Sequence, residues 1–475
     1  MKDDKRVITL PFAPWTGARV QDVLDRVDRM TDEEVETTLA DVRANFGQRH
    51  RDLNAVFHEN FLMLVGRTRK KRKHMADNRK LLIGSYFTME YSLESCALFN
   101  PSIVRHPDQA GIPEGDVRFI MSLRATGEGH ISSVVFRSGV LDHSHNVHFD
   151  PPAKYSSRTR LSPDQVYLKP LFRRKLGEMG VSLTNADAVL EQVPDSFTFT
   201  QLEGAIANRR KDGRGLVKFA ETVDHMRWLA RSNYQLDFGS EVDLSHLIIY
   251  PQSDNEARGI EDLRLVEFRE DDGSIRYFGT YTAYNGFRIL PMLMETADFK
   301  HISIHTLNGA CAQNKGMALF PRRVNGHYAV CSRIDGQNLF IMYSDYVHFW
   351  ETAELLATPA YPWELMIIGN CGSPIETPEG WLLLTHGVGP MRRYCIGAML
   401  LDLENPLRII GRLREPFIVP TEDEREGYVP NVVYSCGSMV YRGELFVPYA
   451  MADRATGFAM IRLDEIIGRL RDSPP

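Results

Sequence analysis

Apolar side chains recur every three or four positions in the first 80 residues, which is the period of an amphipathic helix. One such stripe comprises Val20, Leu24, Val27 and Met30, and a second comprises Val35, Leu39, Val42 and Phe46. Thr31 and Glu34 have the spacing of a capping box ahead of the second stripe, and Gly47 can end it. The pattern therefore predicts an N-terminal helical extension over residues 1–80.

From about residue 81 the pattern changes to short runs rich in Ile, Val, Tyr, Phe and Thr, such as "VRFIMSLRA", "IRYFGTYTAY", "GWLLLTHGV" and "GFAMIRLDEI". Many short strands at fairly regular spacing are typical of a sandwich, barrel or propeller. Residues from about 160 to 235 interrupt the strands with a helical pattern. Ser162 and Pro163 have the order of an N-cap and a first helical position, so a helix is expected to begin there.

Composition and charge narrow the class of protein. The 475 residues are 43% hydrophobic with a formal net charge of -6, so a large core is expected and nucleic acid is not expected as the main partner. The basic run Arg67–His74 is better explained as a solvated helix face than as a binding site for an anionic partner.

No long apolar run predicts a membrane span, and the N-terminus lacks the apolar stretch of a secretory signal. Six cysteines without a C-x-x-C pair predict reduced thiols and not disulfides or zinc ligands. These features predict a cytoplasmic protein.

Two adjacent carboxylates, Glu261 and Asp262, lie between Arg258 and Arg264 just before a strand-like run. A neighbouring carboxylate raises the pKa of an acid, which then can donate a proton at neutral pH. Strand alternation, however, points adjacent side chains to opposite faces. One of the two carboxylates is therefore expected to be catalytic, while the other binds a hydroxyl or pairs with an arginine. These residues alone support structural ion pairing and chemistry equally.

Several familiar catalytic signatures are absent from the sequence, namely the Gly-rich phosphate loops and G-x-S-x-G. Three other segments stand out: "NKGMALFPRR", "SPIETPEGWLLLTHGV" and "VPYAMAD". In the second, a turn at Thr377–Gly380 predicts a hairpin whose second strand carries His386. A lone histidine at a strand end is more often structural than functional.

Together with "NPSIVRHPDQ" and "GIEDLR", these segments resemble glycoside hydrolase family 130, the β-mannoside phosphorylases and related β-mannosidases. The five motifs follow the family's order between about residues 84 and 465, with the first 80 residues and the insertion outside the resemblance. The resemblance implies a five-bladed β-propeller over residues 81–475 with the active site in a central funnel. It also implies that Asp262 is the general acid, passing its proton through a sugar hydroxyl while phosphate attacks from the opposite face.

The resemblance further implies a set of basic phosphate ligands and a set of sugar ligands. Lys315, Arg333 and His386 fall where the family places phosphate-binding residues. Ile367 stands where the family has a further lysine, and Arg392 or Arg393 can supply a substitute charge. The expected substrate-binding residues are Asp453, Arg258, Glu261, Arg124 and Asp108.

The sequence therefore predicts inverting phosphorolysis of a β-mannoside oligosaccharide by inorganic phosphate, releasing mannose 1-phosphate. Phosphate is a co-substrate, and no metal or organic cofactor is implied. The alternatives are an inverting β-mannosidase, which needs a second carboxylate about 6.5–9.5 Å from the acid, and a carbohydrate-binding module without turnover. The apolar faces of the helical segments favour a homo-oligomer. The linkage and the acceptor sugar are left open.

Overall fold

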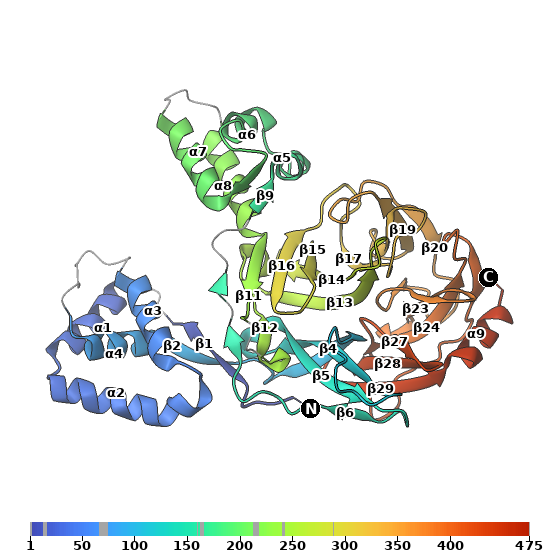
Figure 1. The fold of residues 1–475 in the computed structure, drawn as a ribbon, viewed down its shortest axis with the longest axis horizontal. Helices are drawn as coiled ribbons and strands as arrows, with labels where there is room; N and C mark the ends of the chain where they lie inside the picture. The colour runs from blue at the N-terminus through green and yellow to red at the C-terminus, as the bar shows by residue number, and fades with distance from the viewer. Residues whose placement is uncertain are drawn as a thin grey trace.

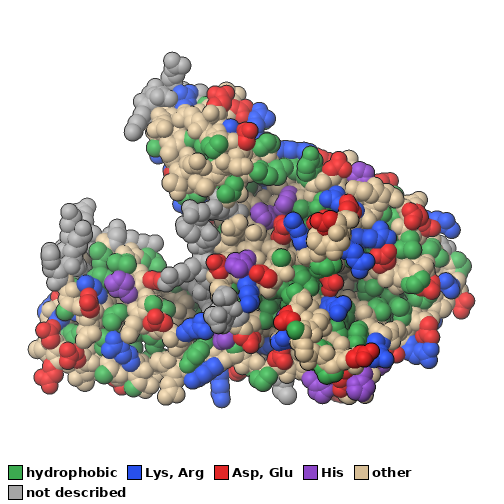
Figure 2. Space-filling model, viewed as in Figure 1, with side chains coloured by type: hydrophobic (Ala, Val, Ile, Leu, Met, Phe, Trp, Pro, Cys, Tyr) green, Lys and Arg blue, Asp and Glu red, His purple; other side chains and the backbone are tan. Residues whose placement is uncertain are grey.

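The computed structural model describes residues 2–12, 17–65, 75–158, 160–161, 166–211, 218–239, 243–287 and 289–474. The basic run Arg67–His74 and the expected helix start at Ser162 and Pro163 lie outside these ranges. The structure is mainly β, with helices gathered near the N-terminus, in one insertion and at the C-terminus (Figure 1). Acidic and basic side chains are interspersed over the face seen in Figure 2.

The N-terminal helices are α1 (Gly17–Arg29), α2 (Asp32–Phe46), α3 (Leu53–Val65) and α4 (Asp77–Tyr86). The two helices expected from the apolar stripes are confirmed. So is the capping box, because Glu34 N donates to the Thr31 side chain and Thr31 N donates to the Glu34 carboxylate. The expectation of strand from residue 81 was wrong, since α4 continues to Tyr86.

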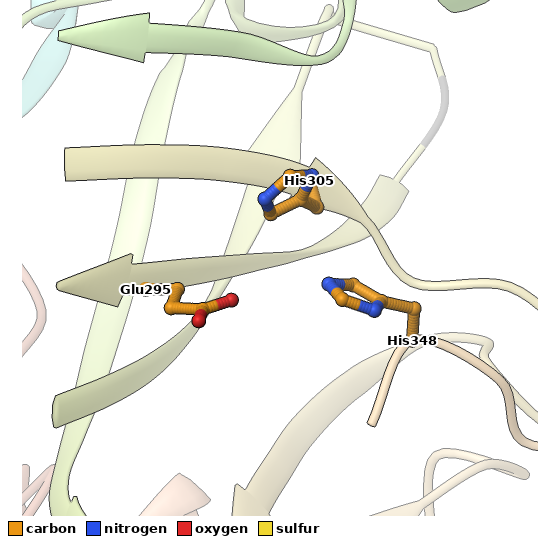
Figure 3. Close-up of side chains that lie close together, drawn as sticks. All are labelled: Glu295, His305 and His348. Atoms are coloured by element: carbon orange, nitrogen blue, oxygen red, sulfur yellow. The ribbon is translucent and has the colours of Figure 1, made fainter. Parts of the chain in front are cut away.

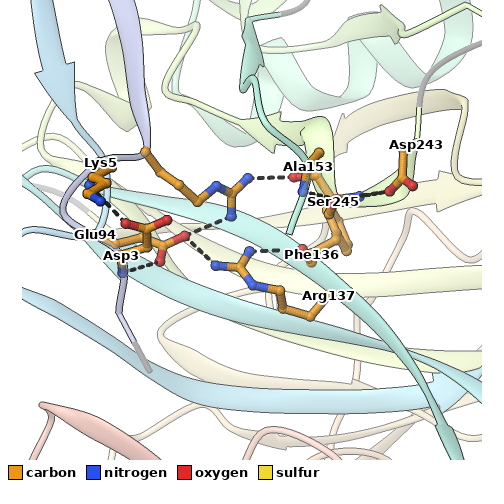
Figure 4. Close-up of polar contacts among 9 residues, drawn as sticks. Asp3, Lys5, Glu94, Phe136, Arg137, Ala153, Asp243 and Ser245 are labelled. Atoms are coloured by element: carbon orange, nitrogen blue, oxygen red, sulfur yellow. Dashed lines mark hydrogen bonds and ion pairs between the residues drawn. The ribbon is translucent and has the colours of Figure 1, made fainter. Parts of the chain in front are cut away.

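A strand also precedes these helices, which the helical pattern did not predict. β1 (Val7–Pro11) pairs with β2 (Thr88–Ser92), so the first segment returns to the start of the β region. Next to β1, Arg6 donates to Glu94 Oε1 at 2.8 Å and Arg137 donates to the same oxygen at 2.6 Å. Figure 4 shows Glu94 beside Arg137 of β5 (Ser132–Leu141). This buried ion cluster fastens the N-terminal segment to the sheet.

Within the described residues, the strands form one large sheet and three smaller ones, together with two short two-stranded pairs. The large sheet runs, in spatial order, β3 (Ala97–Arg105), β4 (Val117–Thr126), β5, β13 (Gly259–Arg269), β14 (Ile275–Tyr284), β15 (Ile289–Thr296), β16 (His301–Thr306), β11 (Tyr234–Asp237) and β8 (Arg160–Leu161). Three further strands belong to this sheet: β6 (Val147–Phe149) and β12 (Leu247–Ile249) pair with β5, and β7 (Ser157–Arg158) pairs with β12.

The smaller sheets follow in chain order. The first comprises β17 (Lys315–Leu319), β18 (Tyr328–Arg333), β19 (Leu339–Ser344) and β20 (Glu354–Ala357). The second comprises β21 (Ile367–Asn370), β22 (Ile375–Thr377), β23 (Gly380–Val388), β24 (Tyr394–Leu401) and β25 (Ile409–Arg412). The third comprises β26 (Val433–Tyr434), β27 (Met439–Tyr441), β28 (Glu444–Met451) and β29 (Ala455–Arg462). The hairpin at Thr377–Gly380 is confirmed, because β22 and β23 pair there.

Each sheet contacts the next sheet along the chain, and the last sheet contacts the first. β14 contacts β17, β18 contacts β21, and β24 contacts β26, while β28 and β29 lie against β3. Apolar side chains fill the spaces between sheets, including the fully buried Trp350, Trp381 and Phe268. All nine residues of β23 are buried, as expected for a strand covered on both faces.

The helical insertion comprises α5 (Lys169–Glu178), α6 (Leu183–Leu190), α7 (Phe199–Lys211) and α8 (Phe219–Arg231), with β9 (Val166–Leu168) paired to β10 (Ser196–Thr198). It has an apolar core of its own around Leu176, Val189 and Met226, and it stands out from the sheets (Figures 1 and 2). Its first described helix begins at Lys169, because the preceding residues pair as β9, and Pro170 lies in its first turn.

At the other end of the chain, "RLDEI" was expected to continue a strand, but α9 (Leu463–Arg471) begins there. Its apolar side chains Ile466, Ile467 and Leu470 are buried, and the helix packs against β24 and β25. Among the described helices, none has the length and apolar character needed to cross a membrane.

Candidate active site

A pocket of about 380 Å³ collects most of the residues predicted from the motifs. Seven of the nine predicted site residues line it: Arg124, Glu261, Asp262, Lys315, Arg333, His386 and Asp453. They come from strands β4, β13, β17, β18 and β23 and from the turn after β28. The pocket therefore lies where the large sheet and all three smaller sheets meet.

The carboxylates of Glu261 and Asp262 face the same pocket, so the expectation from strand alternation was wrong. The pairing of β13 with β14 shifts register between Glu261 and Arg264, and Asp262 has a φ of 57°. Such a bulge interrupts the alternation, so two adjacent side chains can point to the same face of the strand. Arg124 consequently reaches both acids, at 3.0 Å from Glu261 Oε1 and 3.5 Å from Asp262 Oδ1.

Asp262 is buried among hydrogen-bond donors and cations. Asn100 Nδ2 donates to its Oδ1 at 2.6 Å, and Arg264 donates to its backbone carbonyl at 3.1 Å. Burial by itself would raise the pKa of this carboxyl group, but the charges of Arg124, Arg264 and Lys315 hold the pKa below its ordinary value. Asp262 is therefore ionised at neutral pH in the free protein.

Asp453 behaves in the opposite way. Burial, followed by the negative charge of Asp262, raises the pKa of the Asp453 carboxyl group to about 6. Two neighbouring carboxylates whose pKa values are driven apart can take different protonation states at one pH, which is the arrangement acid–base chemistry uses. Like Asp262, Asp453 has left-handed backbone, with a φ of 52°.

The predicted phosphate ligands lie together, but they are not equivalent. Lys315 Nζ lies 2.5 Å from Glu261 Oε2, so its charge is already paired. Arg333 donates from Nη1 to His386 Nε2 at 3.1 Å, and His386 Nδ1 donates to the Asn370 carbonyl at 3.2 Å. This pattern places the imidazole proton on Nδ1.

His386 is consequently a neutral hydrogen-bonding group and not a cation. Burial, reinforced by the charge of Arg333, holds the pKa of its imidazole well below the ordinary value. The Nε of Arg333 is buried without an acceptor in the described part of the chain. A buried guanidinium with an unused donor is suited to a bound anion.

Arg392 and Arg393 were both expected to be able to substitute for the lysine that the resemblance places at position 367. Only one of them lines the pocket. Arg392 lines the pocket, whereas Arg393 and Ile367 are not among its lining residues. Ile367 begins β21 and pairs with Val388, at the end of β23. The apolar character of the pocket wall comes instead from Val429 and Val432.

Two predicted substrate ligands, Arg258 and Asp108, lie outside the lining of this pocket. Arg258 precedes the bulge of β13, and its side chain lies against Gly286. Asp108 follows the far end of β3, in a turn where its N–H donates to His106 Nδ1. Asn100, eight residues earlier in the motif "NPSIVRHPDQ", lies in the first half of β3 and lines the pocket instead.

Sequence reasoning missed Asn100 and three tyrosines, Tyr394, Tyr428 and Tyr434. Tyr434 accepts a hydrogen bond from Arg264 and lies edge-on to the His386 ring, with 4.9 Å between centroids. Tyr428 is exposed and stacks on His130 at 5.2 Å. Asn100 lay within a quoted motif and could have been found there. The tyrosines are isolated in the sequence and carried no signal.

This chain is similar in sequence to known proteins. Residues 238–472 match the family described as beta-1,4-mannooligosaccharide phosphorylase. The chain is 34% identical over 224 residues to the 1,2-beta-oligomannan phosphorylase of Thermoanaerobacter sp. (strain X514), covering 45% of this chain and 72% of that protein. It is 29% identical over 229 residues to the beta-1,2-mannobiose phosphorylase of Listeria innocua, covering 47% of this chain and 63% of that protein.

Among solved structures, the same Listeria innocua enzyme in complex with beta-1,2-mannobiose superposes with a TM-score of 0.47 at 20% identity, over 81% of this chain and 94% of that one. The sequence matches define the class as carbohydrate-active enzymes. The chain belongs to glycoside hydrolase family 130.

Proposed function

We propose that this protein is an inverting β-mannoside phosphorylase. The observation that carries the proposal is one pocket in which the carboxylate of Asp262 lies among the cations Lys315, Arg333 and Arg392. Transfer of a glycosyl group to phosphate needs both a proton for the leaving oxygen and positive charge for a dianion. The relatives named above are phosphorylases of β-1,2 mannosides, and the matching family is described as beta-1,4-mannooligosaccharide phosphorylase, so both support the same substrate class.

In the proposed reaction, a phosphate oxygen forms a bond to the anomeric carbon as the bond from that carbon to the leaving sugar oxygen breaks. The leaving oxygen gains a proton that originates on Asp262 and passes through a sugar hydroxyl. The products are mannose 1-phosphate and a sugar shortened by one mannose. Asp453 and Glu261 are proposed to bind the hydroxyl groups that hold the reacting sugar in place.

Phosphate also provides a way to protonate Asp262. In the free protein the pKa of Asp262 is held low by the positive charges of Arg124, Arg264 and Lys315. A dianion beside Lys315 and Arg333 offsets part of that positive charge, so it raises the pKa of Asp262. We infer that the acid becomes protonated most readily when phosphate is bound, which couples the proton donor to its co-substrate.

The test is incubation of the purified protein with β-1,2- and β-1,4-mannobiose, each with and without phosphate, followed by product identification. Mannose 1-phosphate formed only with phosphate is the expected result. Free mannose released at the same rate under both conditions would instead identify an inverting β-mannosidase. Asp453, the third carboxylate in this pocket, is then the candidate base. Binding of mannobiose without any product would leave only the binding-module alternative.

We further propose that the sheets are the five blades of a propeller. The large sheet divides naturally between β5 and β13, which are joined by the single pair Ser132 and Gly259. The N-terminal helices, which continue through α4 to Tyr86, are proposed as an extension to this catalytic unit, with the insertion at about 160–235 as an addition to it.

A homo-oligomer and a cytoplasmic location complete the proposal. The exposed apolar side chains Leu62 and Met63 on α3 support the first. The six free cysteines support the second. Sedimentation at micromolar concentration tests the oligomer, and a monomer would contradict it.

A further inference from the structure

A second group of side chains with metal-binding chemistry lies away from the pocket of Asp262. Glu295 on β15, His305 on β16 and His348 in the segment after β19 bring their ligand atoms within 4.8 Å of one another. Figure 3 shows the carboxylate and the two imidazole rings converging on one gap. Within the described ranges, no other three His, Cys, Asp or Glu residues are grouped this closely.

The two imidazole rings lie close together, with ring centroids 4.8 Å apart. His348 Nε2 is buried and makes no hydrogen bond within the described residues. An unpartnered buried nitrogen is unfavourable unless a ligand uses it.

Glu295 can contribute one oxygen. Its Oε1 accepts from Arg276 at 2.6 Å, so Oε2 can face the histidines. The charge of Arg276 opposes a cation, but its side chain is 50% exposed and lies 3.8 Å from a second carboxylate, Glu270. Arg276 can therefore remain paired while Glu295 turns toward a metal ion.

The two histidines also border a cavity. A cavity of about 180 Å³ at the base of the helical insertion is lined by both His305 and His348. On the insertion side it is bordered by Phe172 and Lys175, and the ammonium of Lys175 is directed to the Leu307 carbonyl at 3.3 Å and to Glu178 at 3.4 Å. The histidine side of the cavity thus has room for the ion and for a water molecule.

We propose that Glu295, His305 and His348 bind a divalent transition-metal ion of the zinc type. Two imidazoles and one carboxylate are a frequent set of three protein ligands, with water in the fourth position. Ligand atoms about 2.1 Å from a tetrahedral ion lie about 3.4 Å apart, so side-chain rotations that draw the three groups together by roughly 1 Å complete the site.

The three ligands belong to different parts of the fold. β15 and β16 are in the large sheet, whereas the segment after β19 belongs to the next sheet, and it meets the end of β16 through the Asn308–Phe349 bridge. A metal ion there would join the two sheets beside the insertion. None of the three residues lines the pocket of Asp262, so we expect the ion to act on stability and not on the chemical step.

The resemblance in sequence implied no metal, and the two histidines lie 43 positions apart, so no ligand spacing along the chain points to them. Folding brings them together through the contact between the end of β16 and the segment containing Phe349. The proposal is independent of the proposed phosphorylase activity.

The test uses the full chain, freed of metal by a chelator and kept reduced. Zinc binding is measured by calorimetry, cobalt binding by its visible absorption spectrum, and thermal unfolding with and without zinc. We expect one equivalent of zinc, a cobalt spectrum of low coordination number and a higher unfolding temperature with zinc. His348→Ala and Glu295→Gln should lose the cobalt spectrum and weaken zinc binding by at least about tenfold, since outer-shell changes alone cost that much.

The matched control is His327→Ala. His327 is an exposed histidine paired with Asp345 at 2.7 Å, outside the group, so its loss should leave metal binding unchanged. Glu295→Gln keeps the side-chain shape and protects the test against a folding failure of His348→Ala. Zinc binding that is equal in all variants, or absent from the parent chain, would overturn the proposal.

Discussion

Replacing Asp453 by asparagine should stabilise the folded protein relative to the wild type, and the gain should grow as pH rises. The pKa of Asp453 is about 6 in the folded protein against an ordinary 3.8, because burial and the charge of Asp262 penalise its ionised form. A group whose pKa is raised by folding contributes stability that is fully present below its unfolded pKa. That contribution is lost as pH rises through the folded pKa, and asparagine has no such charge to lose.

The size of the effect follows from the pKa difference. Each pKa unit corresponds to about 1.4 kcal/mol, so a rise from 3.8 to about 6 corresponds to about 3 kcal/mol at full effect. Asp453 keeps partial contact with solvent, which screens its interactions, so roughly half of that value is the realistic expectation. The change should occur between about pH 4 and pH 7 and should level off above it.

The assay is urea unfolding of the wild type and of Asp453→Asn across that pH range. Asp108→Asn, which removes an exposed aspartate outside the pocket, controls for the loss of one carboxylate. The difference in free energy of unfolding between Asp453→Asn and the wild type should increase with pH, while the control stays flat. A difference that is constant, or that shrinks as pH rises, would refute the assignment of Asp453 as a buried carboxyl group with a raised pKa.

Three further predictions concern the site and the fold. Asp262→Asn should reduce turnover of unactivated mannobiose by at least about a hundredfold with an unchanged fold, because the amide cannot donate the proton; near-normal activity would remove Asp262 from the role. Arg333→Ala should raise the KM for phosphate roughly ten- to hundredfold, the equivalent of one or two charge-assisted hydrogen bonds, while leaving the KM for mannoside nearly unchanged. Gly84→Ala should lower the thermal unfolding temperature, since its Cβ would lie 1.8 Å from the Phe57 carbonyl oxygen. Gly468→Ala, in a helix with nothing within 4 Å of the new Cβ, should instead stabilise by about 0.5–1 kcal/mol, and the opposite order of the two variants would contradict the packing of α3 on α4.

The periodic segments of the fold could be predicted from the sequence because their burial follows a repeat. The stripes of α1 and α2 face a core with the period of a helix, and the continuous apolar run of β23 is buried on both faces of the strand. The misassigned segments are those whose structure depends on a distant partner. β1 exists because it pairs with β2, and β9 because it pairs with β10, so neither is visible in a local window. The start of α9 was read as strand because its four apolar residues in nine fit either period.

The candidate site, too, could be predicted only in part from the sequence. Its members could be assembled from motifs, but the orientation of Asp262 could not, because strand alternation assumes regular backbone. Asn100, Asp262, Arg392 and Asp453 all have positive φ, and all four line the pocket. Irregular backbone of this kind is costly and is found where surrounding contacts fix it, often at functional sites. The residues that carry the chemistry are thus those for which sequence periodicity is least informative.

The charge balance of the pocket bears on the proposed phosphate binding, because Ile367 stands where the resemblance leads us to expect a lysine. Lys315 is neutralised by Glu261 in the free protein, and His386 is uncharged, so Arg333 and Arg392 hold the positive charge available to an anion. Of these, Arg333 has a buried donor without an acceptor in the described chain, whereas Arg392 reaches the pocket from an exposed turn. We infer that Arg333 fixes the phosphate and that Arg392 supplies the charge that Ile367 cannot. On this reasoning, Arg392→Ala should weaken phosphate binding and Arg393→Ala should not; equal effects of the two variants in phosphate titrations would show that charge near the rim, and not its placement in the pocket, is what matters.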